Sequence, residues 1–165
     1  MPPDPVPPDR LQETVDYVAI TRLQSAYADS VTRRAWAELE ELFVPSATVT
    51  VDTVTSDPIE LVGPTGVGDF ISGAVERFEF FELVILNTTV DLRVGGDPDV
   101  ARARVFTCEL RQDASNGRWT NAFGVYHDEY RRIDGRWWFA RRGYQSIART
   151  GRAEIFPFPQ PPEFD

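Results

Sequence analysis

The 165-residue sequence predicts an α+β domain in which N-terminal helices pack on one face of a curved antiparallel sheet. Two observations indicate this class. Apolar residues near the N-terminus recur mostly at steps of three and four, whereas the second half consists of long strand-like runs separated by turn sequences. The length and a hydrophobic fraction of 42% suit one domain with a single packed core.

Proline-rich segments mark both ends of this domain. Residues 1–10 (MPPDPVPPDR) are predicted to form a flexible leader, because proline fixes φ and lacks a hydrogen-bond donor. In residues 151–165, aromatic side chains alternate with prolines. We expect this C-terminal tail to be extended and to lie on its own domain or on a neighbouring subunit. The folded domain is then expected over residues 11–150.

The first helix is expected over residues 11–34, with Asp9 as its N-cap. Its predicted apolar face comprises Leu11, Val15, Val18, Ala19, Leu23, Ala26, Tyr27 and Val31. A second, short helix is expected from Trp36 to the residues before Pro45. Its apolar residues lie on one face, and the proline ends it.

The segment between these helices and the second half is expected to be mixed. Alternation of apolar and polar residues predicts a strand over 47–54. Glycines and a proline between Gly63 and Gly68 predict a turn, and a further helix is expected over 69–78.

Four long strands are predicted in the second half, over 83–94, 100–112, 118–132 and 136–147. The sequences between them are typical of hairpin turns: Gly95 to Pro98, Asn116-Gly117 and Asp134-Gly135. Strands of this length, bent at Gly124 and Gly143, would wrap around the helices and leave a cavity between the two layers.

Strand parity indicates which side chains face that cavity. On the strand over 100–112, Ala103, Val105, Thr107, Glu109 and Arg111 share the expected inner face. The expected outer face carries Phe106, Cys108 and Leu110. On the next strand, Ala122, Gly124, Tyr126 and Asp128 point inward if Tyr126 does. His127 then points outward, unless a bulge near Gly124 reverses it.

The composition excludes several chemistries. The chain has a formal net charge of −9, no lysine, one histidine and one cysteine. It therefore has no ammonium group for a Schiff base or a P-loop, and no set of residues for a Cys/His zinc site or an intramolecular disulfide. We expect neither cofactor nor metal, and the acidic balance disfavours nucleic acid or an anionic membrane as partner. With no membrane span or signal peptide apparent, a cytoplasmic protein is expected.

The order of residues along the chain resembles the SnoaL-like branch of the NTF2-like superfamily. The resemblance is carried by YADSVTRRAW (27–36), by Leu39, Phe43 and Pro45, by Gly63 and Phe70, and by GVYHDEYRRIDGRW (124–137). Members include polyketide cyclases, scytalone dehydratase and a hexachlorocyclohexane dehydrochlorinase. The resemblance implies a cone-shaped curved sheet around a pocket and a homo-oligomer, either a trimer or a dimer.

The resemblance also implies a catalytic Asp–His dyad at two positions where this chain has other residues. Its Asp belongs four residues before the tryptophan, which is Thr32 here, and its His belongs four residues before Asn87, which is Leu83. Neither residue can abstract a proton from carbon, so the family chemistry does not carry over residue by residue.

An enzyme without this dyad is the first hypothesis. Glu109 would act as the general base or acid, because a carboxylate among apolar side chains has a raised pKa. Tyr126 is a second catalytic candidate, as a hydrogen-bond partner of the substrate. The residues expected around an apolar or polycyclic substrate are Tyr27, Thr32, Leu83, Asn87, Thr107, Ala122 and Gly124. His127 is a further catalytic candidate only if it turns inward. Cyclisation, isomerisation, dehydration and epoxide opening all suit such a site.

Two other hypotheses stay open. The protein is a non-catalytic binder of a small hydrophobic molecule, or its pocket is vestigial and the outer sheet face and tail serve assembly. In either case Glu109 would serve as the partner of an ion pair with Arg111 or another arginine.

Overall fold

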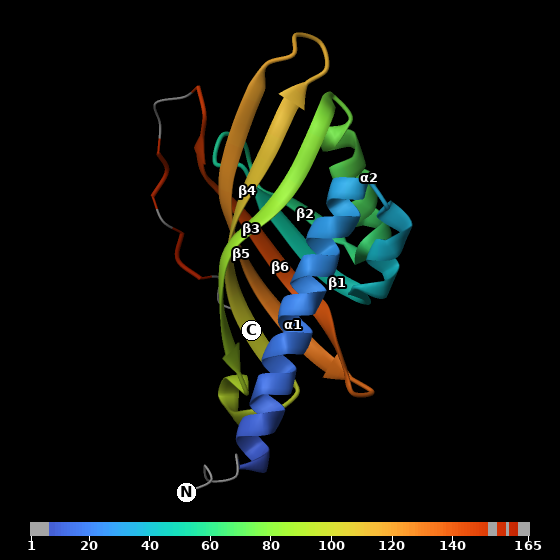
Figure 1. The fold of residues 1–165 in the computed structure, drawn as a ribbon, viewed down its shortest axis with the longest axis vertical. Helices are drawn as coiled ribbons and strands as arrows, with labels where there is room; N and C mark the ends of the chain where they lie inside the picture. Colours follow the sequence, from blue (N-terminus) through green and yellow to red (C-terminus); the bar gives the residue numbers. More distant parts are fainter. Residues whose placement is uncertain (1–6, 152–154, 158, 162–165) are drawn as a thin grey trace, which may run out of the picture.

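The computed structural model describes residues 7–151, 155–157 and 159–161. Two α-helices and a short 3₁₀ helix cover one face of a six-stranded sheet (Figure 1). The elements in chain order are α1 (Pro8–Arg33), η1 (Trp36–Glu41), β1 (Phe43–Asp52), β2 (Ile59–Val62), α2 (Gly63–Val75), β3 (Phe78–Leu92), η2 (Val94–Gly96), β4 (Val100–Asp113), β5 (Trp119–Ile133) and β6 (Arg136–Arg149). The predicted α+β class is confirmed.

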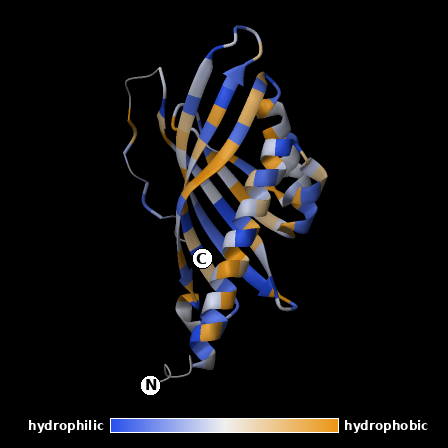
Figure 2. Cartoon of the chain, viewed as in Figure 1, coloured by the Kyte–Doolittle hydropathy of each residue, from blue (hydrophilic) through white to orange (hydrophobic). Residues whose placement is uncertain are grey.

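The strand order in the sheet is β2-β1-β6-β5-β4-β3. β1 runs parallel to β6, and every other pair is antiparallel. The four strands predicted in the second half are present, although β3 begins at Phe78, five residues before its predicted start. Hydrophobic and hydrophilic residues alternate along several strands (Figure 2), as a sheet with one packed face requires.

The tight turn between β5 and β6 has the predicted hairpin chemistry. Asp134 and Gly135 both have positive φ, 50° and 78°. Asp and Gly tolerate this left-handed backbone, which matches the twist of the flanking strands.

Helix α1 begins at Pro8, so the predicted leader is wrong for Pro8 to Arg10, and residues 1–6 lie outside the described residues. The predicted N-cap is also wrong, because Pro7 occupies that position and Asp9 lies in the first turn. Proline is compatible with a first helical turn, since the N–H groups there have no partner within the helix.

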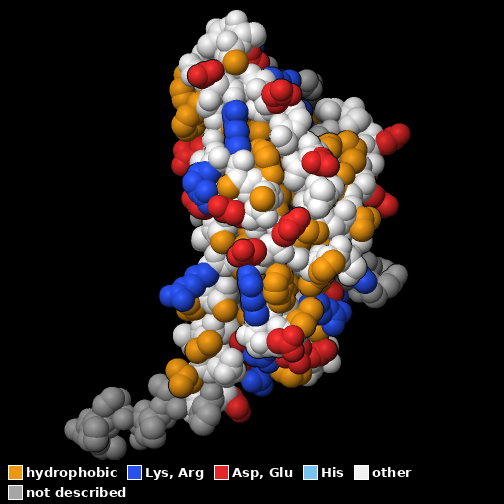
Figure 3. Space-filling model, turned by 90° about the vertical axis from the view of Figure 1, so that its right-hand side faces the viewer, with side chains coloured by type: hydrophobic (Ala, Val, Ile, Leu, Met, Phe, Trp, Pro, Cys, Tyr) orange, Lys and Arg blue, Asp and Glu red, His pale blue; other side chains and the backbone are white. Residues whose placement is uncertain are grey.

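The apolar face of α1 is buried only in its second half. Leu23, Tyr27 and Val31 are buried, as predicted, whereas Leu11, Val15 and Val18 are exposed. The N-terminal turns of α1 extend to one end of the molecule (Figure 1). Figure 3 shows this helix side of the molecule, on which hydrophobic side chains lie scattered among charged ones.

Several boundaries in the first half differ from the prediction: β1 begins four residues early, at Phe43, and α2 ends at Val75 rather than at 78. Pro45 does not end a helix but lies inside β1, where the pairing register with β6 shifts between Phe43 and Thr48. Such an irregularity accommodates a residue without an N–H. The predicted turn from Gly63 to Gly68 is the first part of α2, because Pro64 again stands in a first helical turn. The short strand β2 was not predicted.

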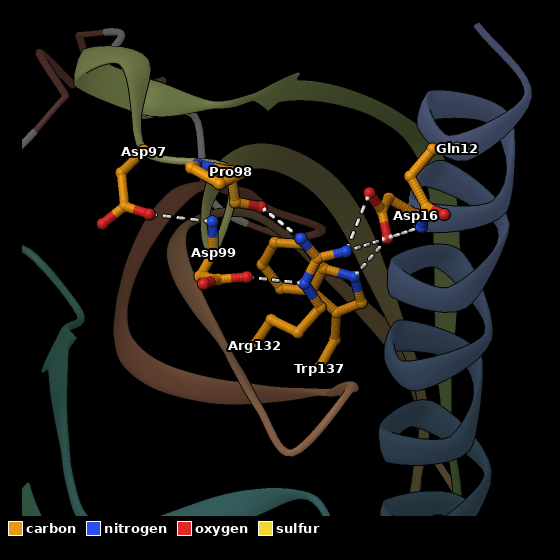
Figure 4. A network of polar contacts seen from close by, with 7 residues as sticks. All are labelled: Gln12, Asp16, Asp97, Pro98, Asp99, Arg132 and Trp137. Carbon is orange, nitrogen blue, oxygen red and sulfur yellow. Dashed lines mark hydrogen bonds and ion pairs between the residues drawn. The ribbon is translucent and has the colours of Figure 1, made fainter. Parts of the chain in front are cut away.

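A polar network fastens the N-terminal half of α1 to the hairpin ends of the sheet (Figure 4). Asp16 accepts hydrogen bonds from Trp137 Nε1 (3.0 Å) and from Arg132 Nη1 (3.1 Å). Arg132 also donates to Asp99 Oδ1 (2.7 Å) and to the Pro98 carbonyl (3.1 Å). Arg132 on β5 thereby joins α1 to the connection that precedes β4 through charge-assisted hydrogen bonds, which fixes how the helix lies on the sheet.

The described part of the tail lies against its own domain. Ile155 forms an isolated antiparallel bridge with Ala148, and Phe156 N donates to the Ile147 carbonyl (2.9 Å). The tail then runs along the side of the sheet that faces away from the helices (Figure 1). Phe158 and Phe164, two of the predicted tail aromatics, lie outside the described residues.

No helix among the described residues combines the length and the apolar character needed to cross a membrane.

Candidate functional site

A cavity of about 270 Å³ lies between the helices and the inner face of the sheet. Most of its wall is apolar. Tyr27 and Val31 come from α1, and Val49 and Val51 come from β1. The part of the wall contributed by α2 consists of Val67, Phe70, Ile71, Ala74 and Val75. A mainly apolar cavity with a few convergent polar groups is typical of a site for a small molecule.

The polar groups of the cavity gather on β4 and β6. Glu109 and Arg111 stand two residues apart on β4 and therefore share its inner face, as parity predicted. Arg111 Nη1 lies 3.3 Å from Glu109 Oε2, and these side chains are 13% and 22% exposed. The ion pair that the sequence left open thus exists, and it lies inside the cavity wall. Arg149 from β6 and Arg77 from the α2–β3 connection complete this group.

Burial changes the acidity of both partners in this pair. Removal from water raises the pKa of Glu109, and the positive charges of Arg111 and Arg149 oppose that rise. Removal from water also lowers the pKa of Arg111, and Arg149 and Arg77 lower it further by repulsion. Glu109 is therefore easier to protonate than a carboxylate in water, which suits a group that gives and takes protons near neutral pH.

Tyr27 and Tyr126 form the floor of the cavity beside this polar wall. Their ring centroids are 6.2 Å apart in an edge-to-face arrangement. Burial raises the pKa of both phenols, with Tyr126 raised further by Tyr27. Both hydroxyl groups therefore stay protonated at neutral pH and can donate a hydrogen bond to a bound molecule.

A buried ion pair between Arg142 and Asp128 packs against these two tyrosines. Arg142 stacks between the two tyrosines, with Cζ 4.1 Å from the Tyr27 centroid and 3.9 Å from the Tyr126 centroid. Its Nε and Nη2 donate to Asp128 at 2.8 and 3.0 Å, and both side chains are almost fully buried. Tyr130 also donates to Asp128 (2.8 Å). The cation–π contacts and the bidentate pair hold the two rings in place.

Thr32 and Leu83, where the resemblance implied the Asp–His dyad, are neighbours in space. The Leu83 backbone N–H donates to Thr32 Oγ1 at 3.1 Å, and the Leu83 side chain lines the cavity. The two elements that would carry a dyad therefore meet here, but this chain places a hydroxyl group and an alkyl group at that point.

Five of the residues proposed from the sequence line the cavity: Tyr27, Leu83, Glu109, Ala122 and Tyr126. The others lie outside its wall. Asn87 is exposed near the middle of β3. Thr107 is buried and donates to the Gly124 carbonyl (3.5 Å), and Gly124 packs beneath the Tyr144 ring.

His127 lies on the outer face of the sheet. The register between β5 and β6 does shift next to Gly124, yet His127 still points away from the cavity. It is 6% exposed and borders a hollow together with Pro159 and Gln160 of the tail. Its Nε2 has no hydrogen-bond partner in the described part of the chain, and burial lowers its pKa.

Sequence reasoning missed Arg149, Arg77 and Tyr144 as cavity residues. Parity counted from Tyr144 along β6 places Ser146 and Ala148 on the inner face of the sheet and therefore predicts that Arg149 points outward. The register shift next to Gly124 pairs Arg149 with Ala122, another cavity residue. No pattern in the sequence predicts this shift in the β5–β6 register. The described residues contain no cluster of three or more His, Cys, Asp or Glu that could hold a metal ion.

The fold and the cavity between its two layers define the class as an NTF2-like α+β pocket protein, and comparison with known proteins agrees. The hexachlorocyclohexane dehydrochlorinase LinA-type3 from Novosphingobium barchaimii is similar at a TM-score of 0.74 and 22% identity, over 92% of this chain and 99% of that one. A type 2 hexachlorocyclohexane dehydrochlorinase is similar at a TM-score of 0.75 and 20% identity, over 91% of this chain and 97% of that one. An NTF2-like protein with a cystatin-like fold from Novosphingobium aromaticivorans is similar at a TM-score of 0.69 and 20% identity, over 88% of this chain and 89% of that one.

The family model described as the SnoaL-like domain matches residues 12–143. The chain belongs to this SnoaL-like family, as its residue order suggested. Identities of this size to the solved structures show a shared fold and leave the chemistry to be argued from the residues of this cavity.

Proposed function

We propose that this SnoaL-like protein is a cofactor-free acid–base enzyme that acts on a small, largely apolar molecule, with Glu109 as the group that moves the proton. The observation that carries the proposal is the position of Glu109, a carboxylate with a raised pKa in the wall of an apolar cavity. Burial of this kind makes a carboxylate a stronger base than it is in water.

The reaction class follows from the groups around that carboxylate. Glu109 removes a proton from a substrate carbon, and the phenol groups of Tyr27 or Tyr126 donate hydrogen bonds to the oxygen on which negative charge develops. Return of the proton to another carbon is an isomerisation, and loss of a leaving group is a dehydration or related elimination. Attack of the carbanion on a carbonyl carbon in the same molecule is a cyclisation.

Hydrogen exchange at carbon tests this proposal without knowledge of the product. Candidate ketones with one or two rings are first ranked by the rise they cause in melting temperature, and the binders are then incubated with the enzyme in D₂O. We expect mass spectrometry to detect deuterium in the bound ketone. Glu109→Gln should still bind it but exchange it about 100-fold or more slowly. Glu79→Gln, a change of an exposed residue on β3, is the matched control.

A non-catalytic binder is the second candidate, and the residues at the dyad positions favour it. Thr32 and Leu83 leave the cavity without the pair that the family resemblance implies. In that case a ketone would stabilise the protein and be recovered without deuterium. Exchange that is equally fast with Glu109→Gln would remove Glu109 from its proposed role.

We also propose a cytoplasmic homo-oligomer. The resemblance supports the assembly, and the single cysteine and net charge of −9 suit a reduced compartment and a partner other than nucleic acid. Sedimentation of the full chain tests the assembly.

A further inference from the structure

The polar wall of the cavity holds more positive than negative charge. Arg77, Arg111 and Arg149 line it, and Glu109 is the carboxylate among its residues. Arg111 is paired with Glu109, whereas Arg149 has no ion pair within the described part of the chain. Repulsion from Arg149 and Arg77 lowers the pKa of Arg111. Arg77 is exposed, whereas Arg111 and Arg149 are partly buried. A charge that is partly removed from water without a partner is costly, so the unpaired Arg149 beside Arg111 points to a missing anion.

Two of these arginines also have unused donors. Five buried side-chain nitrogen or oxygen atoms among the described residues lack a hydrogen-bond partner, and two of them are Nε of Arg111 and Nε of Arg149. Both residues line the same cavity. Buried donors almost always have an acceptor, and a carboxylate is the acceptor that best matches a guanidinium group.

The Arg111 guanidinium group also contacts an aromatic ring, which helps to fix its position. Its Cζ lies 5.3 Å from the centroid of Phe78, and Arg77 Cζ lies 4.7 Å from the same ring. The contact with Phe78 and the ion pair with Glu109 restrict where Arg111 can turn. A site that is already positioned binds its ligand with a smaller loss of conformational entropy.

We propose that the molecule bound here carries a carboxylate, which Arg149 and Arg111 hold, on an apolar body that fills the rest of the cavity. The wall formed by α2, with Phe70 and Ile71, suits a hydrocarbon. A cavity of about 150 Å³ holds benzene, so about 270 Å³ admits a body of one or two rings. The substrate class is thus a small ketone of one or two rings that also carries a carboxylate.

This inference rests on the proposed function, because it names the substrate class of the same cavity, and it explains how the substrate lies. An anion bound at Arg111 is close to Glu109, since Arg111 Nη1 is 3.3 Å from Glu109 Oε2. Glu109 then reaches the part of the substrate near its carboxylate, where a C–H group next to the ketone carbonyl can lose its proton. Arg111 lies between the two carboxylates and reduces their repulsion.

Three probes of one shape test the inference by binding alone: 2-naphthoate, its neutral amide 2-naphthamide, and naphthalene. Titration calorimetry on the full chain should show that the acid binds at least about ten-fold tighter than the amide, as expected for charge-assisted hydrogen bonds. Arg149→Gln should remove this preference while naphthalene binding stays the same, and Arg149→Lys should keep part of it. Arg10→Gln removes one exposed positive charge outside the cavity and is the matched control.

The outcomes separate the two proposals. Equal affinity for the acid and the amide overturns the anion site. Proton transfer by Glu109 is then still decided by the deuterium exchange test. If none of the three probes binds, both the anion site and an aromatic substrate are overturned. A preference for the acid that survives in Arg149→Gln, shown to be folded by its melting temperature, excludes Arg149 as the anion ligand.

Discussion

Gly124 and Tyr144 lie in such close contact that residue 124 has no room for a β-carbon. A methyl group built on Gly124 would overlap the Cε2, Cζ and hydroxyl oxygen atoms of the Tyr144 ring. The Gly124 backbone does not have positive φ, so the requirement for glycine here is one of space alone. Tyr144 in turn forms part of the cavity wall. The glycine on β5 therefore determines how far this ring extends into the cavity.

Gly124→Ala should push the Tyr144 ring toward the cavity and destabilise the fold by about 1–3 kcal/mol, as overpacking does. Urea unfolding of Gly124→Ala, Tyr144→Ala and the double variant gives the coupling between the two sites. We expect the alanine at 124 to cost much less when the ring is absent. Additive effects would show that the two residues do not conflict.

The buried ion pair behind the cavity floor should be essential to the fold. Asp128→Asn leaves Arg142 without its counter-charge among the rings of Tyr27 and Tyr126, and loss of one partner of a buried pair typically costs about 3–5 kcal/mol. Denaturant unfolding measures this change. Asp29→Asn removes the partner of Arg33 in an exposed pair and should leave the unfolding midpoint unchanged. Similar losses in both variants would contradict the importance given to burial.

Proton transfer by Glu109 should depend on pH in a direction that its surroundings set. Burial raises the pKa of this carboxyl above its ordinary value of 4.5, and Arg149 opposes the rise. Exchange of a bound ketone needs the ionised carboxylate, so its rate should increase as pH passes upward through the raised pKa. Arg149→Gln should move this midpoint to higher pH, because it removes a charge that favours ionisation. A midpoint that moves to lower pH or stays constant would contradict the electrostatic role of Arg149.

The raised pKa of Glu109 also makes the stability of the fold depend on pH. A carboxyl group whose pKa is higher in the folded state contributes stability that is fully present below pH 4.5, the ordinary value. That contribution is lost as pH rises through the folded-state pKa. The free energy of unfolding of Glu109→Gln should therefore increase relative to that of the unchanged chain as pH rises across this interval. A difference that is constant with pH would mean that burial does not perturb Glu109.

The long strands were predictable because two independent signals agree on them. Turn sequences such as Asp134-Gly135 bound the runs, and alternation within each run identifies the packed face. Alternation alone therefore places Glu109 and Tyr126 on the side of the cavity. Proline-containing boundaries were predicted poorly. Pro8 and Pro64 each stand in the first turn of a helix, where proline is tolerated, and Pro45 lies in an irregular strand.

The arginines of the cavity were harder to foresee. Arg149 lies opposite Ala122 because the β5–β6 register shifts, and Arg77 belongs to a connection whose direction no periodicity encodes. The exposure of Leu11 and Val15 has a similar origin. The sequence shows that one side of α1 is apolar but not how far the sheet extends beneath it.

The contact between Thr32 and Leu83 allows a direct test of the dyad geometry, because the Leu83 N–H reaches Thr32 Oγ1 at 3.1 Å. Leu83→His alone should place an imidazole in the apolar cavity wall, where burial lowers its pKa. Adding Thr32→Asp should raise that pKa by about one unit or more, because a carboxylate within reach favours the imidazolium. Proton NMR can follow the new imidazole easily, since His127 is the one histidine already in the chain. Equal pKa values in the single and double variants would show that the two side chains do not meet, and the assignment of these positions to the family dyad would then be wrong.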